Sequence, residues 1–108
     1  MSVEEIQRLC KENKIRWTEH VMLRLIKRHI SRNDVKHALE IGEVIEQYPD
    51  DYPYPSCLVL GASVSGEYLH IVCGVGDLEL WIITAYHPDR SEWTDDLRRG
   101  LVYEMLYV

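Results

Sequence analysis

The chain has 108 residues, which is enough for one domain with a single modest core and too few for two. Its content of 46% hydrophobic and 28% charged residues is typical of a folded soluble protein and excludes a disordered chain. The formal net charge of −6 argues against non-specific binding to nucleic acid, because such binding depends on neutralising phosphates.

The N-terminal sequence predicts a cytoplasmic protein. Residues 2–13, SVEEIQRLCKEN, are charged throughout and lack the apolar run of a signal peptide. No apolar window approaches the roughly 18 residues that span a bilayer, so no membrane partner is expected. The three cysteines have no CxxC spacing, and the sequence therefore predicts structural thiols rather than a disulfide framework.

Positive charge is concentrated in the first part of the chain. Residues 1–41 hold nine Lys and Arg against six Asp and Glu, whereas residues 42–108 hold three against twelve. Because charges act over about 8 Å at physiological salt, a local basic face can attract an anionic ligand even on an acidic protein. The asymmetry permits such a ligand at the N-terminal helices without requiring one.

The first predicted helix covers residues 2–13. Ser2 can cap it, and two glutamates in its first turn suit the positive end of the helix dipole. Residues 15–17 are too few for a helix and are predicted to form a strand at the edge of a sheet.

A two-faced helix is predicted over about residues 19–29, with Thr18 placed to cap it. A third helix begins after Ser31, whose spacing to Asp34 is typical of an N-terminal capping arrangement, and ends at Gly42. At about 100° per residue, the apolar side of the second helix gathers Val21, Met22, Leu25, Ile26 and His29.

Four strands are predicted after residue 43 in an antiparallel meander, and a loop with three prolines separates the first two. The predicted fold class is therefore α+β, with N-terminal helices packed on one face of a four-stranded or larger curled antiparallel sheet. One domain is expected over residues 1–108, with an added N-terminal helix and an apolar C-terminal tail. The predicted strands cover residues 44–48, 57–62, 67–75 and 78–87.

One group of candidate site residues lies on the polar side of the second helix. His20, Arg24 and Arg28 follow one another at intervals of four residues, so they share one side of the helix. Guanidinium groups bind phosphate or carboxylate, and an imidazole can transfer a proton near neutral pH. A solvent-exposed charged face with no ligand remains the alternative.

His70 is the second candidate, within the predicted strand YLHIVCGV. If Ser65 and Gly66 close a two-residue hairpin, Gly61 lies opposite His70 and leaves space for a pocket above the sheet. The alternative is a histidine on a solvated sheet face.

Tyr86 is a further candidate whose position depends on the turn near residues 75–79. A two-residue turn at Gly76 and Asp77 puts His87 on the same face as His70. A three-residue loop puts Tyr86 there instead. The sequence does not choose between the two registers.

No metal or cofactor is predicted. The chain has no HxxxH or CxxC pair, no serine triad, no P-loop and no dinucleotide fingerprint. His29 is expected to be half-buried and His37 to lie at the surface.

An ordered set of motifs spans roughly residues 15–95. The motifs are HxxxRxxxR from His20, ISxxDV from Ile30, GEVIExYPDD from Gly42, PYPSCLVLG from Pro53, LHIV from Leu69, and YHPD from Tyr86 followed by Trp93. Together they resemble domain-of-unknown-function family 4258, which looks like a relative of the RelE/ParE toxins, small bacterial α+β domains.

This resemblance implies a metal-independent endoribonuclease, or a toxin-like relative that has lost or changed its activity. By position, the matching site residues are His20, Arg24, Arg28 and His70, with Tyr86 as a further candidate. The expected mechanism is acid–base cleavage through the RNA 2′-hydroxyl, with arginines stabilising the phosphorane. RelE-type ribonucleases have a strongly basic surface, whereas this chain is acidic.

Two other functions fit the same sequence. The first is a non-enzymatic module that binds a cognate antitoxin or another protein. The apolar tail LVYEMLYV, residues 101–108, would then complete the core or cover a partner, including a second copy in a homodimer. The second is a histidine–arginine pocket for a small anionic ligand.

Overall fold

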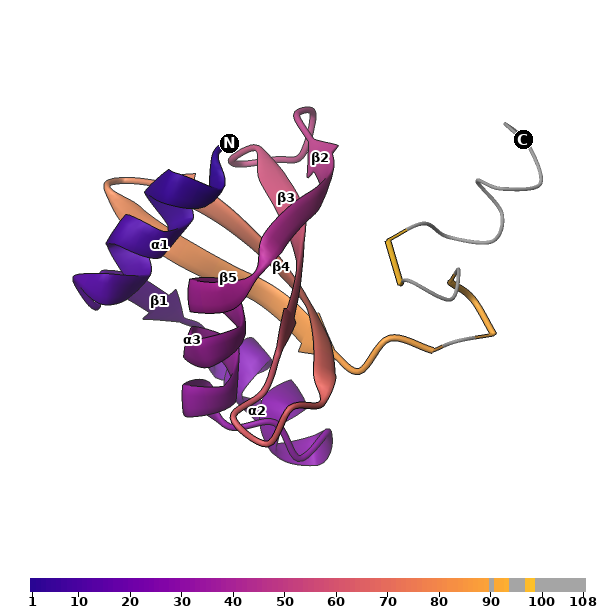
Figure 1. Cartoon of the computed structure of the whole chain (residues 1–108). Coiled ribbons are helices and arrows are strands. Elements are labelled where there is room, and N and C mark those ends of the chain that lie inside the picture. Colours follow the sequence, from indigo (N-terminus) through magenta and orange to yellow (C-terminus); the bar gives the residue numbers. More distant parts are fainter. Residues whose placement is uncertain (90, 94–96, 99–108) are drawn as a thin grey trace, which may run out of the picture.

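The computed structural model describes residues 1–89, 91–93 and 97–98, and within them three helices lie along one face of a five-stranded sheet (Figure 1). The α+β class is confirmed. The tail at residues 101–108 lies outside the described residues. The elements in chain order are α1 (Val3–Lys11), β1 (Ile15–Trp17), α2 (Glu19–Lys27), α3 (Arg32–Ile41), β2 (Glu43–Tyr48), β3 (Ser56–Ala62), β4 (Tyr68–Gly76) and β5 (Glu79–Tyr86).

The sheet has the order β1-β5-β4-β3-β2. Strands β2 to β5 form the predicted antiparallel meander, and β1 lies at an edge as predicted. The prediction of a wholly antiparallel sheet is wrong, because β1 pairs parallel to β5, with Ile15 opposite Leu80. No hairpin joins these two strands, so the local sequence does not fix their relative direction.

The helix caps follow the sequence closely. The hydroxyl of Thr18 accepts from the backbone N–H of Val21 at the start of α2, and Ser31 and Asp34 form a reciprocal capping box at the start of α3. The helices are nine or ten residues long, and none in the described part of the chain is long and apolar enough to cross a membrane.

The apolar side of α2 is narrower than predicted. Val21 and Leu25 are buried, but Ile26 is 68% exposed. His29 is also exposed rather than half-buried, because α2 ends at Lys27 and His29 adopts a left-handed backbone conformation with φ of 58°. The helical period therefore stops before it can place His29 on the buried side.

The core lies between the helices and the facing side of the sheet. Alternate residues of β3 and β4 point into it, among them Cys57 and Cys73, which are opposite each other on the two strands. Together with Cys10 they are free and buried, as predicted for structural thiols. Residues between these alternate positions face the other way, onto a surface called here the outer face.

The β3–β4 register differs by one residue from the predicted two-residue hairpin. Leu60, not Gly61, lies opposite His70, because the turn is closed at Ser63 and Glu67 and contains three residues. Gly61 faces the helices, where an added Cβ would come within 2.2 Å of the Ala38 carbonyl oxygen. The space at Gly61 is therefore filled by the backbone of α3 and offers no pocket above His70.

The β4–β5 hairpin follows neither predicted register alone. Gly76 pairs with Glu79 across a two-residue turn, but the register shifts by one at Ile83, so that Tyr86 lies directly opposite His70. This bulge adds one residue to β5 and exchanges the faces of the residues beyond it. Tyr86 rather than His87 consequently shares the outer face with His70.

We expect Gly61→Ala to lower the free energy of unfolding by about 2 kcal/mol or more, since the added methyl group meets backbone atoms of α3 that cannot move aside. Urea denaturation followed by circular dichroism measures this. Gly74→Ala is the matched control in β4, because only the Pro55 carbonyl oxygen lies closer than 3.4 Å, at 2.9 Å. Equal losses in both variants would contradict the close approach of α3 to β3.

Candidate functional site

Strand pairing aligns four side chains in one row across the outer face. The row runs from Glu43 on β2 through Leu60 on β3 and His70 on β4 to Tyr86 on β5. Each pair is directly opposite, so neighbouring side chains are about 5 Å apart at their Cβ atoms. The row brings a carboxylate, an imidazole and a phenol onto one surface.

His70 is the centre of this row and is fully buried. Its Nε2 lies 2.8 Å from the carbonyl oxygen of Leu97, and its Nδ1 lies 3.4 Å from the Tyr86 hydroxyl. The Trp93 ring meets the imidazole edge-on, with 4.4 Å between centroids and 83° between planes. Because a carbonyl oxygen only accepts, Nε2 carries the proton, and Nδ1 accepts a long hydrogen bond from Tyr86.

Burial sets the protonation of both groups. It lowers the pKa of His70 below its ordinary value, against smaller opposing effects of the Leu97 carbonyl and the Glu46 carboxylate. Burial also raises the pKa of Tyr86, with the carboxylates of Glu46 and Glu92 adding to the effect. A neutral imidazole therefore lies beside a neutral phenol at pH 7, a pair that can supply one base and one acid.

Arg28 reaches the same end of the sheet from α2. Its Nη1 donates to the Thr84 hydroxyl at 3.0 Å and to the Ala85 carbonyl oxygen at 2.9 Å. Strand β1 covers β5 only as far as Ile82, so the guanidinium occupies the edge of β5 where the neighbouring strand has ended. Its positive charge acts on Tyr86 and lowers the pKa of that phenol, opposing burial.

Of the five predicted residues, His70 and Tyr86 contact each other, and Arg28 binds β5 next to Tyr86. His20 and Arg24 are exposed on the same side of α2, and neither side chain makes a hydrogen bond or ion pair with the described residues. At a rise of 1.5 Å per residue, Arg24 is about 6 Å and His20 about 12 Å from Arg28 along the helix axis. Arg24 extends the positive charge away from the His70 row, and His20 lies one turn beyond it.

Glu46 was not predicted as a site residue, yet the negative charge of its carboxylate raises the pKa of both His70 and Tyr86. It reaches the outer face because the β2–β3 register shifts between Val44 and Glu46. Its carboxylate accepts a 2.5 Å hydrogen bond from the Tyr48 hydroxyl. A bulge of this kind leaves no mark in a residue pattern, so only the structure identifies Glu46.

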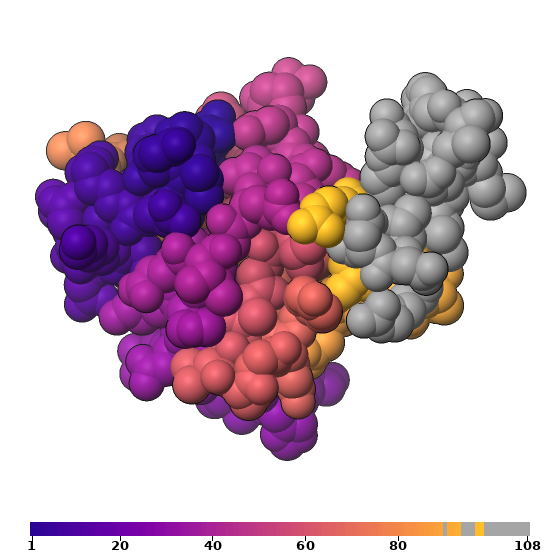
Figure 2. Space-filling view, viewed as in Figure 1, coloured from indigo at the N-terminus to yellow at the C-terminus, as the bar shows by residue number. Residues whose placement is uncertain are grey.

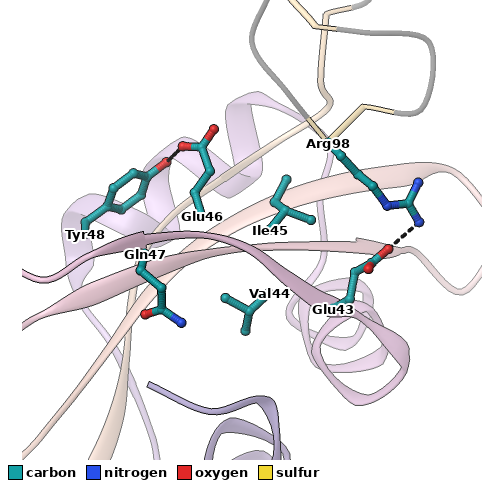
Figure 3. A pocket seen from close by; sticks show the side chains of 7 residues that line it. All are labelled: Glu43, Val44, Ile45, Glu46, Gln47, Tyr48 and Arg98. Carbon is teal, nitrogen blue, oxygen red and sulfur yellow. Dashed lines mark hydrogen bonds and ion pairs between the residues drawn. The ribbon is translucent and has the colours of Figure 1, made fainter. Parts of the chain in front are cut away.

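A pocket of about 640 Å³ opens along β2, lined by all six residues of that strand and by Arg98 (Figure 3). Glu43 and Glu46 make its wall acidic, and Arg98 forms an ion pair with Glu43. Arg98, which follows β5 in the chain, thus contacts β2 at the opposite edge of the sheet.

The remaining histidines lie away from the row's centre. His37 is half-buried rather than at the surface, with its Nδ1 2.8 Å from the Ala62 carbonyl oxygen, since α3 packs closely on β3. His87 is exposed beside Glu67. Within residues 1–89, 91–93 and 97–98, no three His, Cys, Asp or Glu side chains are grouped so that they could hold a metal ion.

A family described as "Domain of unknown function (DUF4258)" matches residues 17–87. The chain belongs to the DUF4258 family. The matched part of this DUF4258 protein begins just before α2 and ends just after β5, so it contains Arg28, His70 and Tyr86. Trp93, Leu97 and Arg98 lie beyond it. No curated protein and no solved structure matches the chain.

The lowered pKa of His70 predicts a loss of stability in mild acid. The unfolded chain binds a proton at this histidine before the folded chain does, so the free energy of unfolding falls as the pH drops below about 6.5. Urea midpoints at pH 7.5 and 5.5 measure the fall. His70→Gln should reduce it, because its amide can donate to Leu97 and does not titrate.

His20→Gln is the control, since it removes an exposed histidine and leaves the buried one in place. A pH dependence that is the same in His70→Gln and the unaltered protein would contradict the assignment of a buried neutral imidazole.

Proposed function

We propose that this DUF4258 protein is a RelE/ParE-like toxin-type domain that cleaves RNA without a metal ion. The observation that carries the proposal is that His70 contacts Tyr86 while Arg28 binds Thr84 and Ala85, the residues just before Tyr86 on β5. Arg28, His70 and Tyr86 come from α2, β4 and β5 and belong to separate motifs of the family-matched segment. Together they supply a cation, a base and an acid, the groups that phosphodiester cleavage requires.

In the proposed reaction, the neutral imidazole of His70 takes the proton of the RNA 2′-hydroxyl. The 2′-oxygen attacks the adjacent phosphorus, and the bond to the 5′-oxygen breaks. The Tyr86 hydroxyl donates its proton to that leaving oxygen, so the products are a 2′,3′-cyclic phosphate and a 5′-hydroxyl. Arg28 stabilises the negative charge of the phosphorane.

Electrostatics favour one direction of approach for the RNA. Glu43 and Glu46 on the β2 side repel phosphates, whereas His20 and Arg24 continue the positive side of α2 beyond Arg28. We therefore assign His20 and Arg24 to the binding of flanking phosphates rather than to proton transfer. A short basic path of this kind suits a locally bound RNA on an acidic protein.

A second candidate is a non-enzymatic interaction module of the same fold. The observation that favours it is the complete burial of His70 beneath Trp93 and Leu97, as expected of a structural histidine. The acidic pocket along β2 would then receive a basic segment of a partner protein.

We expect the purified protein to cleave labelled RNA in the presence of EDTA. His70→Ala and Tyr86→Phe should each reduce the initial rate about 100-fold or more, because each removes one partner of acid–base catalysis. His20→Ala should weaken RNA binding more than it reduces the maximal rate. Gel electrophoresis of the products and a test for cyclic phosphate ends measure the reaction.

Lys27→Ala is the matched control, because it removes an exposed cation of α2 one position before Arg28. Circular dichroism shows that each variant is folded. Absence of cleavage both by the unaltered protein and by Trp93→Ala, which removes the ring over His70, would contradict the ribonuclease and favour the interaction module. Cleavage that His70→Ala and Tyr86→Phe leave unchanged would contradict it as well.

A further inference from the structure

Three described residues that follow β5 contact the outer face of the sheet. Trp93 and Leu97 lie on His70 in β4, and Arg98 pairs with Glu43 in β2. These contacts reach two members of the row, His70 on β4 and Glu43 on β2. Figure 2 shows the described residues of this C-terminal segment, in yellow, against the atoms of the sheet.

We propose that this row is a docking site for the chain's own C-terminal segment, and that the docked segment inhibits the site by covering His70. The docked residues are Trp93, Leu97 and Arg98. The inhibitory role rests on the proposed ribonuclease function, whereas the docking itself does not. The segment lies outside the family-matched residues 17–87, so it adds to a domain that already contains the site.

The contacts occupy the positions that a substrate would need. Nε2 of His70 is held by the Leu97 carbonyl, one side of the ring is covered by Trp93, and no part of the side chain is exposed. RNA cannot reach His70 while these contacts persist.

Two of the described contacts are of kinds that are weak individually. The contacts include an edge-on ring contact, one hydrogen bond to a backbone carbonyl, burial of Leu97, and an ion pair whose side chains are 47% and 51% exposed. Exposed ion pairs contribute little to stability, and an edge-on aromatic contact contributes modestly. A competing ligand can therefore replace the segment without unfolding the sheet.

The test loosens the segment at two places and measures the accessibility of His70 directly. Diethylpyrocarbonate modifies accessible neutral imidazoles, and mass spectrometry of the peptides reports His70 and the exposed His20 separately. Trp93→Ala should increase the modification rate of His70 tenfold or more, and Arg98→Glu should increase it about twofold to fivefold. The rate at His20 should stay the same.

Charge exchange separates docking from general destabilisation. Glu43→Arg combined with Arg98→Glu restores an ion pair of opposite orientation and should return the His70 rate towards that of the unaltered protein. Arg8→Glu is the control, because it disrupts a similarly exposed ion pair between α1 and its C-terminal cap residue Glu12, away from the outer face.

RNA cleavage measured on the same variants tests the inhibition. Loosening variants should cleave faster than the unaltered protein. If His70 becomes accessible and no variant cleaves RNA, the docking is supported and the ribonuclease function fails. If His70 stays unreactive in Arg98→Glu while the variant is folded, or if cleavage falls as accessibility rises, the inhibitory segment is overturned. Should Trp93→Ala not fold, the two charge variants decide.

Discussion

The bulge at Ile83 determines which side chains share the outer face of the sheet. Between the Asp77–Leu78 turn and the bulge, the even-numbered residues of β5 face the core. Beyond the bulge, the odd-numbered residues face the core instead. Tyr86 thereby comes opposite His70, while Ala85 turns into the core. A second shift, on β2, brings Glu46 to the same surface. Two single-residue irregularities on strands that flank β3 and β4 thus assemble the polar row and its electrostatic surroundings.

The guanidinium of Arg28 connects the helical layer to β5, the strand that carries Tyr86. Arg28 is the C-terminal cap of α2, and its side chain bridges to β5 beyond the end of β1. The position of the cation relative to Tyr86 therefore depends on how far β1 extends and on where α2 ends. A helix end, a strand edge and a bulge fix the three groups of the proposed mechanism, and none of these groups depends on a long loop.

The sequence predicts local structure well and long-range pairing poorly. Ser2, Thr18 and Ser31 mark the helix starts correctly, because a cap depends only on neighbouring residues. Arg28, His70 and Tyr86 also lie within the residues that the family matches. The parallel pairing of β1, the bulge at Ile83 and the burial of His70 were not predictable, because each depends on segments distant in the chain. Nothing in the sequence around Trp93 and Leu97 indicates that they cover the imidazole of His70, which lies more than twenty residues earlier in the chain.

The parallel pairing of β1 with β5 also constrains the order in which the fold can form. Residues 15–17 are made early, yet their only strand partner in the described sheet is residues 80–82. Contacts of such sequence separation form slowly, because a long loop must close before they contribute. During synthesis, the edge of the sheet and the position of α2 beside β5 are completed only after the last described strand has emerged. A fragment that ends before β5 has neither the partner of β1 nor the edge that Arg28 binds, so the site and the fold are completed by the same strand.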